Sequence, residues 1–383
     1  MDLSVTVVGA GIGGMATSLL LSRAGATVVL LERVREATAV GAGLLLQANG
    51  LAVLSGLDLD EKLRAGGFLS AGVPVRAADG AVISSLPVPD FGEGLDRVLA
   101  VRRSAVHEAL LAAVSAAPGI ELRLGVEVRA GESFGTELVV GADGVSSAVR
   151  TGGDFGARVR RTGAVYLRGL VPLVGDGFAG EWWTASGLFG GAPVDAATQY
   201  FYASATAPAV RAAVAARDLP ALRRAWATAL PAAATVFDAV GSFDDLLVNE
   251  VVRVDCARWA DGRRVLLGDA AHAMAPNAGQ GANSALVDAA VLTEELARTA
   301  TVEAALTAYT ARRRRRVRRV QDAADRLARL AHWRGRTTTL LRDALLGFVD
   351  RRAGLAERLV RTTMQEDPAA LRETVRSLAI RSA

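Results

Sequence analysis

The feature that most constrains the fold is a glycine-rich turn near the N-terminus. Residues 9–14 read GAGIGG, after a short apolar run from Leu3 to Val8 and before a helix-like stretch from Met15 to Arg23. A continuous β-branched run is typical of a parallel strand that is buried on both faces. Gly25 is a candidate helix end, and Thr27 to Leu31 is a second apolar run. The chain is therefore predicted to begin with a βαβ unit.

Three glycines of this turn have separate structural tasks. Gly9 permits the tight turn, Gly11 lets the backbone approach a pyrophosphate, and Gly14 allows helix and strand to pack closely. The helix N-terminus offers free N–H groups and a partial positive charge to phosphates. Glu32 ends the second strand, where an acid is expected to bind ribose hydroxyls, and Arg33, the next residue, is a further candidate contact of the cofactor. A dinucleotide site is predicted, against the alternative of a turn that binds nothing, but NAD and FAD are not distinguished.

Two distant segments separate these cofactors. Residues 139–150 read VVGADGVSSAVR, and residues 264–272 read RVLLGDAAH. They resemble the DG and GD motifs of the flavoprotein aromatic hydroxylases, the FAD monooxygenase family typified by p-hydroxybenzoate hydroxylase. With the N-terminal turn they follow the order found in that family. The resemblance spans about residues 3 to 330.

The resemblance implies roles for residues near the GD motif. Asp269, which follows Gly268, would bind the ribityl chain of the flavin. The next turn would run alongside the isoalloxazine ring, with backbone N–H groups reaching its carbonyls and a helix N-terminus favouring negative charge on the reduced ring. The candidate contacts in that turn are Pro276, Gly279, Gly281, Ala282 and Asn283.

At the DG motif, the resemblance implies that Asp143 and Gly144 contact the pyrophosphate and take part in binding the nicotinamide cofactor, with Arg150 nearby. The alternative is that Asp143 and Asp269 only cap turns, because Asp-Gly is a common turn pair. His272 is expected to be structural and is given no catalytic role.

Two further positions are carried over from the family. Arg103 matches an arginine that helps to hold FAD, with Arg102 as a rival and a surface salt bridge as the alternative role. Val128 matches a position whose backbone meets the adenine end of FAD. This region departs from the family pattern, because only 12 residues separate Gly125 from Leu138, where many relatives have a longer hairpin.

Two departures from the family pattern and one aromatic segment complete the candidates. Val287-Asp288 stands where the family usually has Glu-Asp, and Gln47 replaces a frequent proline. Neither change removes a group that flavin chemistry requires. Aromatic residues gather between Tyr166 and Tyr202, and for any one of them the core of a sheet is favoured over the wall of a substrate site.

The fold implied is an α/β, Rossmann-like FAD-binding domain with an inserted mixed-sheet substrate domain and a helical C-terminal segment. The FAD-binding domain is expected at 1–72, 98–160 and 256–298, the substrate domain at 73–97 and 161–255, and the C-terminal segment at 299–383. Within these regions, helices are expected over 51–65, 104–116, 281–298 and 302–330, and strands over 73–88, 120–128, 137–140 and 265–267. From about Thr162 to Val254 the sequence is mostly strand-like.

The reaction implied is that of an FAD-dependent monooxygenase. NADPH or NADH reduces FAD, and O₂ then gives a flavin C4a-hydroperoxide that passes one oxygen atom to a small organic substrate, which is expected to be aromatic or polyketide-like. Hydroxylation is the family's commonest outcome, with epoxidation and Baeyer–Villiger oxidation as alternatives. Competing functions on this scaffold are a flavin oxidase, a dehydrogenase and an isoprenoid reductase. A non-catalytic FAD-binding protein is a further alternative.

Composition sets limits on the class of protein. Of 383 residues, 51% are hydrophobic and 22% charged, which allows a large packed core and argues against disorder. The formal net charge is +4. The arginine-rich run at 312–319 is expected to be a solvated helix face, with an electrostatic partner site as the alternative. No nucleic-acid partner is predicted.

The location is inferred from a few residues. Cys256 is the single cysteine and cannot form an internal disulfide, which favours a reducing cytosol. The three histidines, His107, His272 and His332, have no metal-ligand spacing, so no metal is expected. The N-terminus lacks a positively charged signal region, and no apolar stretch reaches the ~20 residues of a membrane helix. A cytoplasmic monomer or homodimer without a membrane span is predicted.

Overall fold

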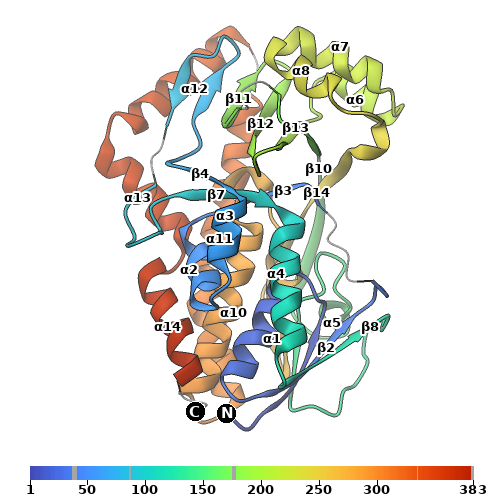
Figure 1. Ribbon diagram of the computed structural model, residues 1–383, viewed down its shortest axis with the longest axis vertical. Helices are drawn as coiled ribbons and strands as arrows, with labels where there is room; N and C mark the ends of the chain where they lie inside the picture. The colour runs from blue at the N-terminus through green and yellow to red at the C-terminus, as the bar shows by residue number, and fades with distance from the viewer. Residues whose placement is uncertain (37–40, 86–87, 175–177, 334, 381–383) are drawn as a thin grey trace.

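The computed structural model describes residues 1–36, 41–85, 88–174, 178–333 and 335–380. They form three β-sheets with helices between and around them (Figure 1). A six-stranded sheet lies toward one end of the long axis and a seven-stranded sheet toward the other. This arrangement confirms the predicted fold class.

The six-stranded sheet has the order β15-β16-β9-β1-β2-β8. β1 pairs in parallel with β2 and β9, and only β15, at one edge, is antiparallel to its neighbour. The predicted βαβ start is therefore present. The strands are β1 (Ser4–Val8), β2 (Thr27–Glu32), β8 (Ile120–Leu124), β9 (Leu138–Gly141), β15 (Ala260–Asp261) and β16 (Arg264–Leu266).

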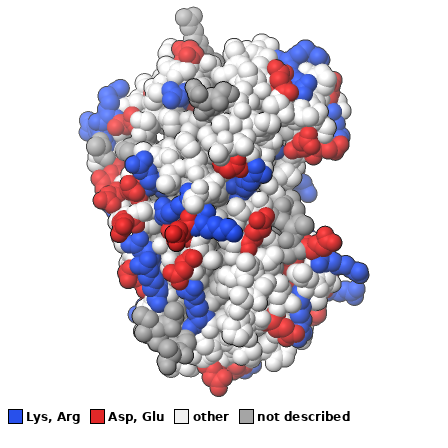
Figure 2. All heavy atoms as spheres, viewed as in Figure 1, with Lys and Arg blue, Asp and Glu red and all other residues white. Residues whose placement is uncertain are grey.

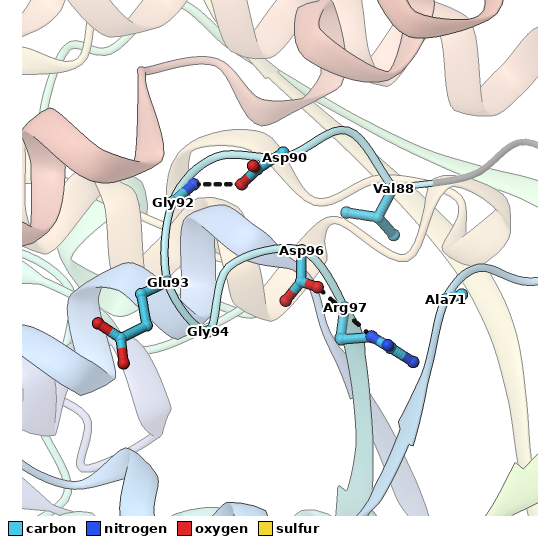
Figure 3. Close-up of a pocket in the computed structure, with 8 residues that line it drawn as sticks. All are labelled: Ala71, Val88, Asp90, Gly92, Glu93, Gly94, Asp96 and Arg97. Atoms are coloured by element: carbon cyan, nitrogen blue, oxygen red, sulfur yellow. Dashed lines mark hydrogen bonds and ion pairs between the residues drawn. The ribbon is translucent and has the colours of Figure 1, made fainter.

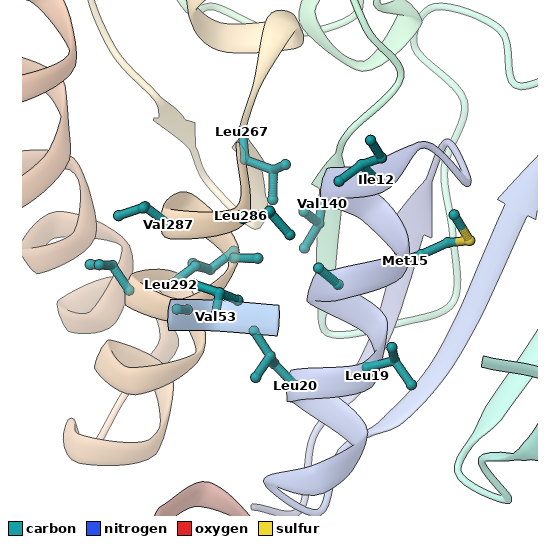
Figure 4. Close-up of a cluster of buried hydrophobic side chains, with 14 of the residues drawn as sticks. Ile12, Met15, Leu19, Leu20, Val53, Val140, Leu267, Leu286, Val287 and Leu292 are labelled. Atoms are coloured by element: carbon teal, nitrogen blue, oxygen red, sulfur yellow. The ribbon is translucent and has the colours of Figure 1, made fainter. Parts of the chain in front are cut away.

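Helices pack on this sheet through a continuous apolar core. α1 (Ile12–Arg23) lies against α10 (Gly281–Arg298), and Leu20 and Leu286 are among their fully buried side chains (Figure 4). The two helices come very close, since a Cβ added at Gly13 would lie 3.0 Å from that of Ala285. α2 (Ala48–Gly56) and α4 (Arg103–Ala116) pack beside them.

The seven-stranded sheet has the order β14-β10-β13-β12-β11-β5-β6 and is mixed, because β5 runs parallel to β11 while the other pairs are antiparallel. The short β5–β6 hairpin turns at residues 77–81, near the predicted turn at Asp79-Gly80. The strands are β5 (Val75–Ala77), β6 (Val82–Ser84), β10 (Ala157–Pro172), β11 (Gly180–Thr184), β12 (Gly187–Pro193), β13 (Thr198–Ser204) and β14 (Leu247–Cys256).

The prediction that residues 162–254 are mostly strands missed three helices. Three helices, α6 (Pro208–Ala215), α7 (Leu219–Ala229) and α8 (Pro231–Asp238), cover one face of the seven-stranded sheet (Figure 1). Alanine is the strongest helix former, and each of these helices has proline in its first turn, where the missing N–H costs nothing. These two signals mark the helices that the aromatic content obscured.

A third sheet, of order β3-β7-β4, lies between the other two (Figure 1). Its strands are β3 (Gly43–Leu46), β7 (Val98–Arg102) and β4 (Phe68–Ser70). The helix predicted over residues 51–65 is in fact two, α2 and α3 (Asp60–Gly66). They are separated at Asp58, which has a φ of 63° and cannot continue a right-handed helix.

The C-terminal part is helical, as predicted, with α11 (Val302–Ala331), α12 (Arg336–Asp350), α13 (Ala353–Met364) and α14 (Pro368–Ile380). The arginine-rich run on α11 is only partly a solvated face. Arg313 is fully buried and bonds to Asp288 and Gln365, while Arg312 pairs with acids of α10 and with Glu366. The run therefore fastens the C-terminal segment to α10.

The surface and the helices bear on the predicted partners. On the face shown in Figure 2, basic and acidic side chains are interspersed. No helix in the described parts of the chain is long and apolar enough to cross a membrane. No group of three or more His, Cys, Asp or Glu side chains suited to a metal ion occurs among the described residues.

Candidate active site

A cavity of about 610 Å³ lies between the two large sheets. Its first wall is formed by the turns that leave the carboxyl ends of β1, β9 and β16, where open α/β sheets bind their ligands. Its second wall is one face of the seven-stranded sheet. Of the predicted site residues, those that line it are Gly11, Arg103, Gly144, Gly268, Asp269, Pro276, Gly279, Gly281 and Ala282.

The glycine-rich turn is interlocked with its neighbours. Gly9 has a φ of +99°, and a Cβ there would lie 2.6 Å from the carbonyl oxygen of Ala142. A Cβ on Gly14 would lie 1.9 Å from the carbonyl oxygen of Gly9. A Cβ on Gly11 would instead meet nothing within 4 Å. Gly9 and Gly14 therefore hold the turn together behind the cavity, while Gly11 leaves its surface open.

The N-terminus of α1 faces the cavity through Ile12 and Gly13. Gly11 is the N-cap residue, and no side chain caps this helix. The helix is 12 residues long, so its first turn presents unsatisfied N–H groups and the positive end of its dipole. This end of the cavity is suited to a phosphate group.

Glu32 lies beside the turn rather than in the cavity lining. Its carboxylate accepts hydrogen bonds from the backbone N–H groups of Ala10, at 2.8 Å, and Val34, at 3.1 Å. Arg33, the next residue, is exposed. Val128 is half-buried and packs on the main core, outside the cavity lining.

The two aspartates of the motifs differ in their contacts. One oxygen of Asp143 accepts hydrogen bonds from the N–H groups of Ala148 and Val149, and the other is buried without a partner among the described residues. Asp269 lines the cavity, and no hydrogen bond to its carboxylate occurs within the described parts of the chain. Turn capping thus uses one carboxylate oxygen of Asp143, and among the described residues it uses neither oxygen of Asp269.

Two consecutive arginines, Arg102 and Arg103, point to different places. Arg102 bonds to Asp195 and Thr198 at the end of its strand. Arg103 lines the cavity, and Gly41 makes room for it, since a Cβ there would lie 2.2 Å from the Arg103 Cδ. Burial lowers the pKa of Arg103, and the charge of Asp269 opposes this shift. Between the two rivals, only Arg103 is placed to meet a ligand.

Arg150 joins the two motifs. Its guanidinium donates to the carbonyl oxygen of Val145, in the DG segment, and to that of Ala270, at 2.8 Å, in the GD segment. The turn that carries the GD motif is also held in place by Asp288 of α10. This carboxylate accepts hydrogen bonds from the N–H of Gly268 and from His272. His272 is thus part of the support of this turn.

Asp288 is the centre of a fully buried charge cluster. Its second oxygen accepts from Arg313 at 2.8 Å. Burial alone would raise the pKa of Asp288, but His272 and Arg313 outweigh this effect and hold it below its usual value. The aspartate of the Val287-Asp288 pair therefore keeps a structural task that the substitution at Val287 does not affect.

The turn before α10 carries the next set of predicted contacts. Gly279 has a φ of +62°, and Gly281 and Ala282 begin a helix of 18 residues with no side-chain cap. Asn283 points away from the cavity and donates to the carbonyl oxygens of Gly279 and Leu45. Asn283 is therefore a residue that positions the turn.

Gln47 has a use that its sequence position did not reveal. Its amide donates to the carbonyl oxygen of Ala278 and its oxygen accepts from Gln280. Its backbone N–H donates to Asn283. The glutamine that replaces a frequent proline thus ties β3 to the turn before α10.

The second wall contains polar side chains that were not predicted for the site. They come from β10, β11, β13 and β14 and are Tyr166, Arg168, Glu181, Tyr200, Tyr202 and Asn249. Tyr166 donates to Asn277 at 2.9 Å and so joins this wall to the turn before α10. The alternation along β13 was the available signal: Phe201, between the two tyrosines, faces the opposite side and packs against α6–α8.

A second hollow, of about 530 Å³, lies at the surface beside the loop 88–97 (Figure 3). Asp90 accepts from the N–H of Gly92 at 2.8 Å, and Arg361 and Arg372 of the C-terminal helices donate to backbone oxygens of the loop. This hollow shares no lining residue with the cavity and contains no predicted site residue.

Comparisons with known proteins agree on one family. Residues 2–133 and 123–324 match the model of the FAD binding domain family. The 2-heptyl-3-hydroxy-4(1H)-quinolone synthase of Pseudomonas aeruginosa is 35% identical over 317 residues, which cover 76% of this chain and 80% of that protein. The aurachin C monooxygenase/isomerase of Stigmatella aurantiaca is 31% identical over 327 residues, covering 80% and 84%.

A solved structure has the same fold. HpxO of Klebsiella pneumoniae, complexed with FAD and uric acid, superimposes with a TM-score of 0.79 at 23% identity. The match covers 94% of this chain and 97% of HpxO.

Proposed function

Because this chain belongs to the FAD-dependent monooxygenases of the aromatic hydroxylase type, we propose that it hydroxylates a small aromatic or heteroaromatic substrate held against the seven-stranded sheet. FAD is its cofactor and NAD(P)H its co-substrate. The observation that carries the proposal is a cavity with two walls, one formed by glycine turns and helix N-termini that suit a dinucleotide and the other containing tyrosine, arginine and glutamate side chains.

The residues of the first wall fit FAD. The open surface at Gly11 and the uncapped N-terminus of α1 suit the pyrophosphate. Among the described residues the carboxylate of Asp269 has no hydrogen-bond partner, which suits the ribityl hydroxyls, and one buried oxygen of Asp143 is a further acceptor without a partner there. We assign Gly144, Gly268 and Arg103 to the same molecule, and Glu32 to its ribose.

The turn before α10 fits the flavin ring. Gly279, Gly281 and Ala282 line the cavity with little side chain, so backbone N–H groups can reach a ligand's carbonyl oxygens. The N-terminus of α10 then favours negative charge at that place. We assign Pro276 to the same ring contact. We keep Arg33 as a proposed contact of the cofactor and Val128 as a proposed backbone contact at its adenine end.

The protein's own part in the reaction is to bind, orient and exclude water. Bound FAD supplies the redox chemistry, since it accepts a hydride from NAD(P)H and activates O₂, so that one oxygen atom goes to the substrate and the other to water. Tyr166 and the turn before α10 fix the distance between the substrate wall and the ring. Apolar side chains such as Leu188, Leu247 and Met274 keep the space between them dry.

The substrate class follows from the wall and from the relatives. The name of the Pseudomonas relative contains a hydroxylated quinolone with a heptyl chain, and HpxO binds uric acid. Both are heteroaromatic rings with polar edges. A wall that combines Arg168, Glu181 and tyrosines with leucine and methionine suits such a ring.

The test begins with the purified protein and its flavin. We expect a yellow protein that NAD(P)H bleaches under argon. A panel of 4-quinolones, hydroxylated benzoates and purines should contain compounds that accelerate NAD(P)H oxidation in air, with one oxygen atom added to the product mass. O₂ consumption that yields only hydrogen peroxide for every compound would instead favour the oxidase or dehydrogenase alternatives.

Three further predictions stay proposals. The chain divides at 1–72, 98–160 and 256–298, at 73–97 and 161–255, and at 299–383. All strands of the six-stranded sheet fall in the first set, which supports this division. We propose that the protein is cytoplasmic and that it is a monomer or homodimer. Size-exclusion chromatography with light scattering would decide its oligomeric state.

A further inference from the structure

Five side-chain positions form a straight row across the seven-stranded sheet. Arg168 on β10 pairs directly with Leu247 on β14 and with Tyr202 on β13. Tyr202 pairs with Gly190 on β12, which in turn pairs with Glu181 on β11. Directly opposed residues of neighbouring strands share one face of the sheet. This face is the second wall of the cavity.

The glycine in the row lets its two neighbours meet. A Cβ on Gly190 would lie 2.6 Å from Cζ and 2.7 Å from Oη of Tyr202. The tyrosine side chain therefore crosses above β12 and donates to an oxygen of Glu181 at 2.9 Å. Any larger residue at position 190 would occupy the space through which the tyrosine reaches the acid.

Glu181 is held as an acceptor at the cavity wall. Its other carboxylate oxygen accepts a hydrogen bond from the indole N–H of Trp183. Burial raises the pKa of Glu181, while the hydrogen bonds from Trp183 and Tyr202 oppose the shift. Burial also raises the pKa of Tyr202 well above its usual value, so this hydroxyl keeps its proton and remains a donor.

Arg168 lies on the other side of Tyr202. It is half-buried at the cavity wall, and none of the described residues forms an ion pair or hydrogen bond with its side chain. Most buried charged groups have a partner, because desolvating one without compensation is costly. The row thus has a cation without a partner among the described residues on one side of Tyr202 and a proton acceptor on the other, with the Tyr202 hydroxyl between them.

We propose that Glu181, acting through Tyr202, accepts the proton of an acidic O–H or N–H group on the substrate, and that Arg168 binds the anion that remains. This inference rests on the proposed function. It identifies the substrate as an aromatic ring with one ionisable edge, whose anion is the more electron-rich form and thus the better acceptor of an electrophilic oxygen atom.

Protons and charges are conserved within the row. The substrate's proton moves to Oη of Tyr202 while the proton of Tyr202 moves to Oε2 of Glu181. The substrate gains the negative charge that the carboxylate loses, and Tyr202 ends as a donor to the substrate anion. No proton leaves the cavity, and no co-reactant is needed. The raised pKa of Glu181 favours this transfer because it makes the carboxylate a stronger base.

The groups around Glu181 set its pH dependence. Tyr166 and Arg168 face it from β10, and Tyr200 and Tyr202 from β13. Two cations lie on the neighbouring tryptophan rings, Arg76 of β5 over Trp182 and Arg342 of α12 over Trp183. Glu181 is the single carboxylate that the cavity has on its sheet side within the described residues.

The test uses the FAD-loaded protein and 4-nitrophenol, whose anion is coloured. Difference spectra should show the bound probe as its anion at a pH where the free probe is mostly neutral, and a weakly buffered indicator should register no release of protons. In Glu181→Gln and in Tyr202→Phe, the anionic fraction at that pH should fall about tenfold or more, the effect of losing an interaction worth one pKa unit.

Controls separate this effect from damage to the fold. Glu250→Gln makes the same chemical change on the same sheet, where the carboxylate bonds to Arg161 outside the cavity, and should behave as the wild type. Gly190→Ala removes no polar group but displaces Tyr202, so it should reproduce the loss if Glu181→Gln fails to fold. FAD content is measured for each variant.

Three results would overturn the inference. They are a wild type that does not bind 4-nitrophenol, a wild type that binds it in the neutral form, and an anionic fraction that survives both Glu181→Gln and Gly190→Ala. Failure of the proposed function is seen separately, as a yellow protein that ionises the probe but adds oxygen to no aromatic compound.

Discussion

The two walls of the cavity are built from different parts of the chain. The first is backbone, in which Gly9 and Gly14 interlock and the N-termini of α1 and α10 face the ligand. The second is a set of side chains in register across β14, β10, β13 and β11. A backbone wall cannot change without moving the fold, whereas a side-chain wall can change one residue at a time. The cofactor site should therefore be strongly coupled to stability, and the substrate site only weakly.

The strongest test of this coupling is the buried cluster behind the first wall. Asp288→Asn removes the close charge partner of the fully buried Arg313 and leaves it only Glu366, at 4.0 Å, so we expect a loss of about 3–5 kcal/mol in the free energy of unfolding. Urea denaturation measures it. Asp322→Asn is the control: Asp322 pairs with Arg253, which keeps Asp255 and Asp325, and its loss should cost less than about 1 kcal/mol. Equal, small losses would contradict the coupling.

The glycine turn offers a matched pair within a single wall. Gly14→Ala places a Cβ on the carbonyl oxygen of Gly9, so it should lower the stability of the FAD-free protein by about 1–3 kcal/mol. Gly11→Ala meets open space and should leave that stability unchanged while weakening FAD binding. Thermal unfolding without FAD and titration with FAD measure the two effects. A stable Gly14→Ala variant would show that the turn relaxes.

The adjacent arginines test which side chain belongs to the first wall. Arg103→Gln should weaken FAD binding by about tenfold or more, the usual effect of losing a charged hydrogen-bond donor. Arg102→Gln should leave it unchanged, because Arg102 bonds to Asp195 and Thr198 instead. Fluorescence quenching of the flavin on binding measures both. The reverse result would return the assignment to Arg102.

The two walls also differ in how far the sequence predicts them. The turn at Gly9–Gly14 is continuous in the chain and its spacing follows from backbone sterics, so its position could be read directly. Glu181 and Tyr202 are 21 residues apart and meet only because hairpin register brings both opposite Gly190. Nothing local specifies that register, or which face of β13 lines a cavity. The buried partners of Arg313 depend likewise on how α11 packs.

The smallest effect we predict concerns the second wall and has a defined sign. Because burial raises the pKa of Glu181, the folded protein binds its proton more tightly than the unfolded chain, where the pKa is near 4.5. The free energy of unfolding of the wild type, relative to that of Glu181→Gln, therefore falls as the pH rises from 4.5 through the raised pKa of Glu181. The variant should melt at a higher temperature than the wild type at neutral pH, and the difference should shrink in acid. A difference that does not depend on pH would mean that Glu181 does not titrate in this range.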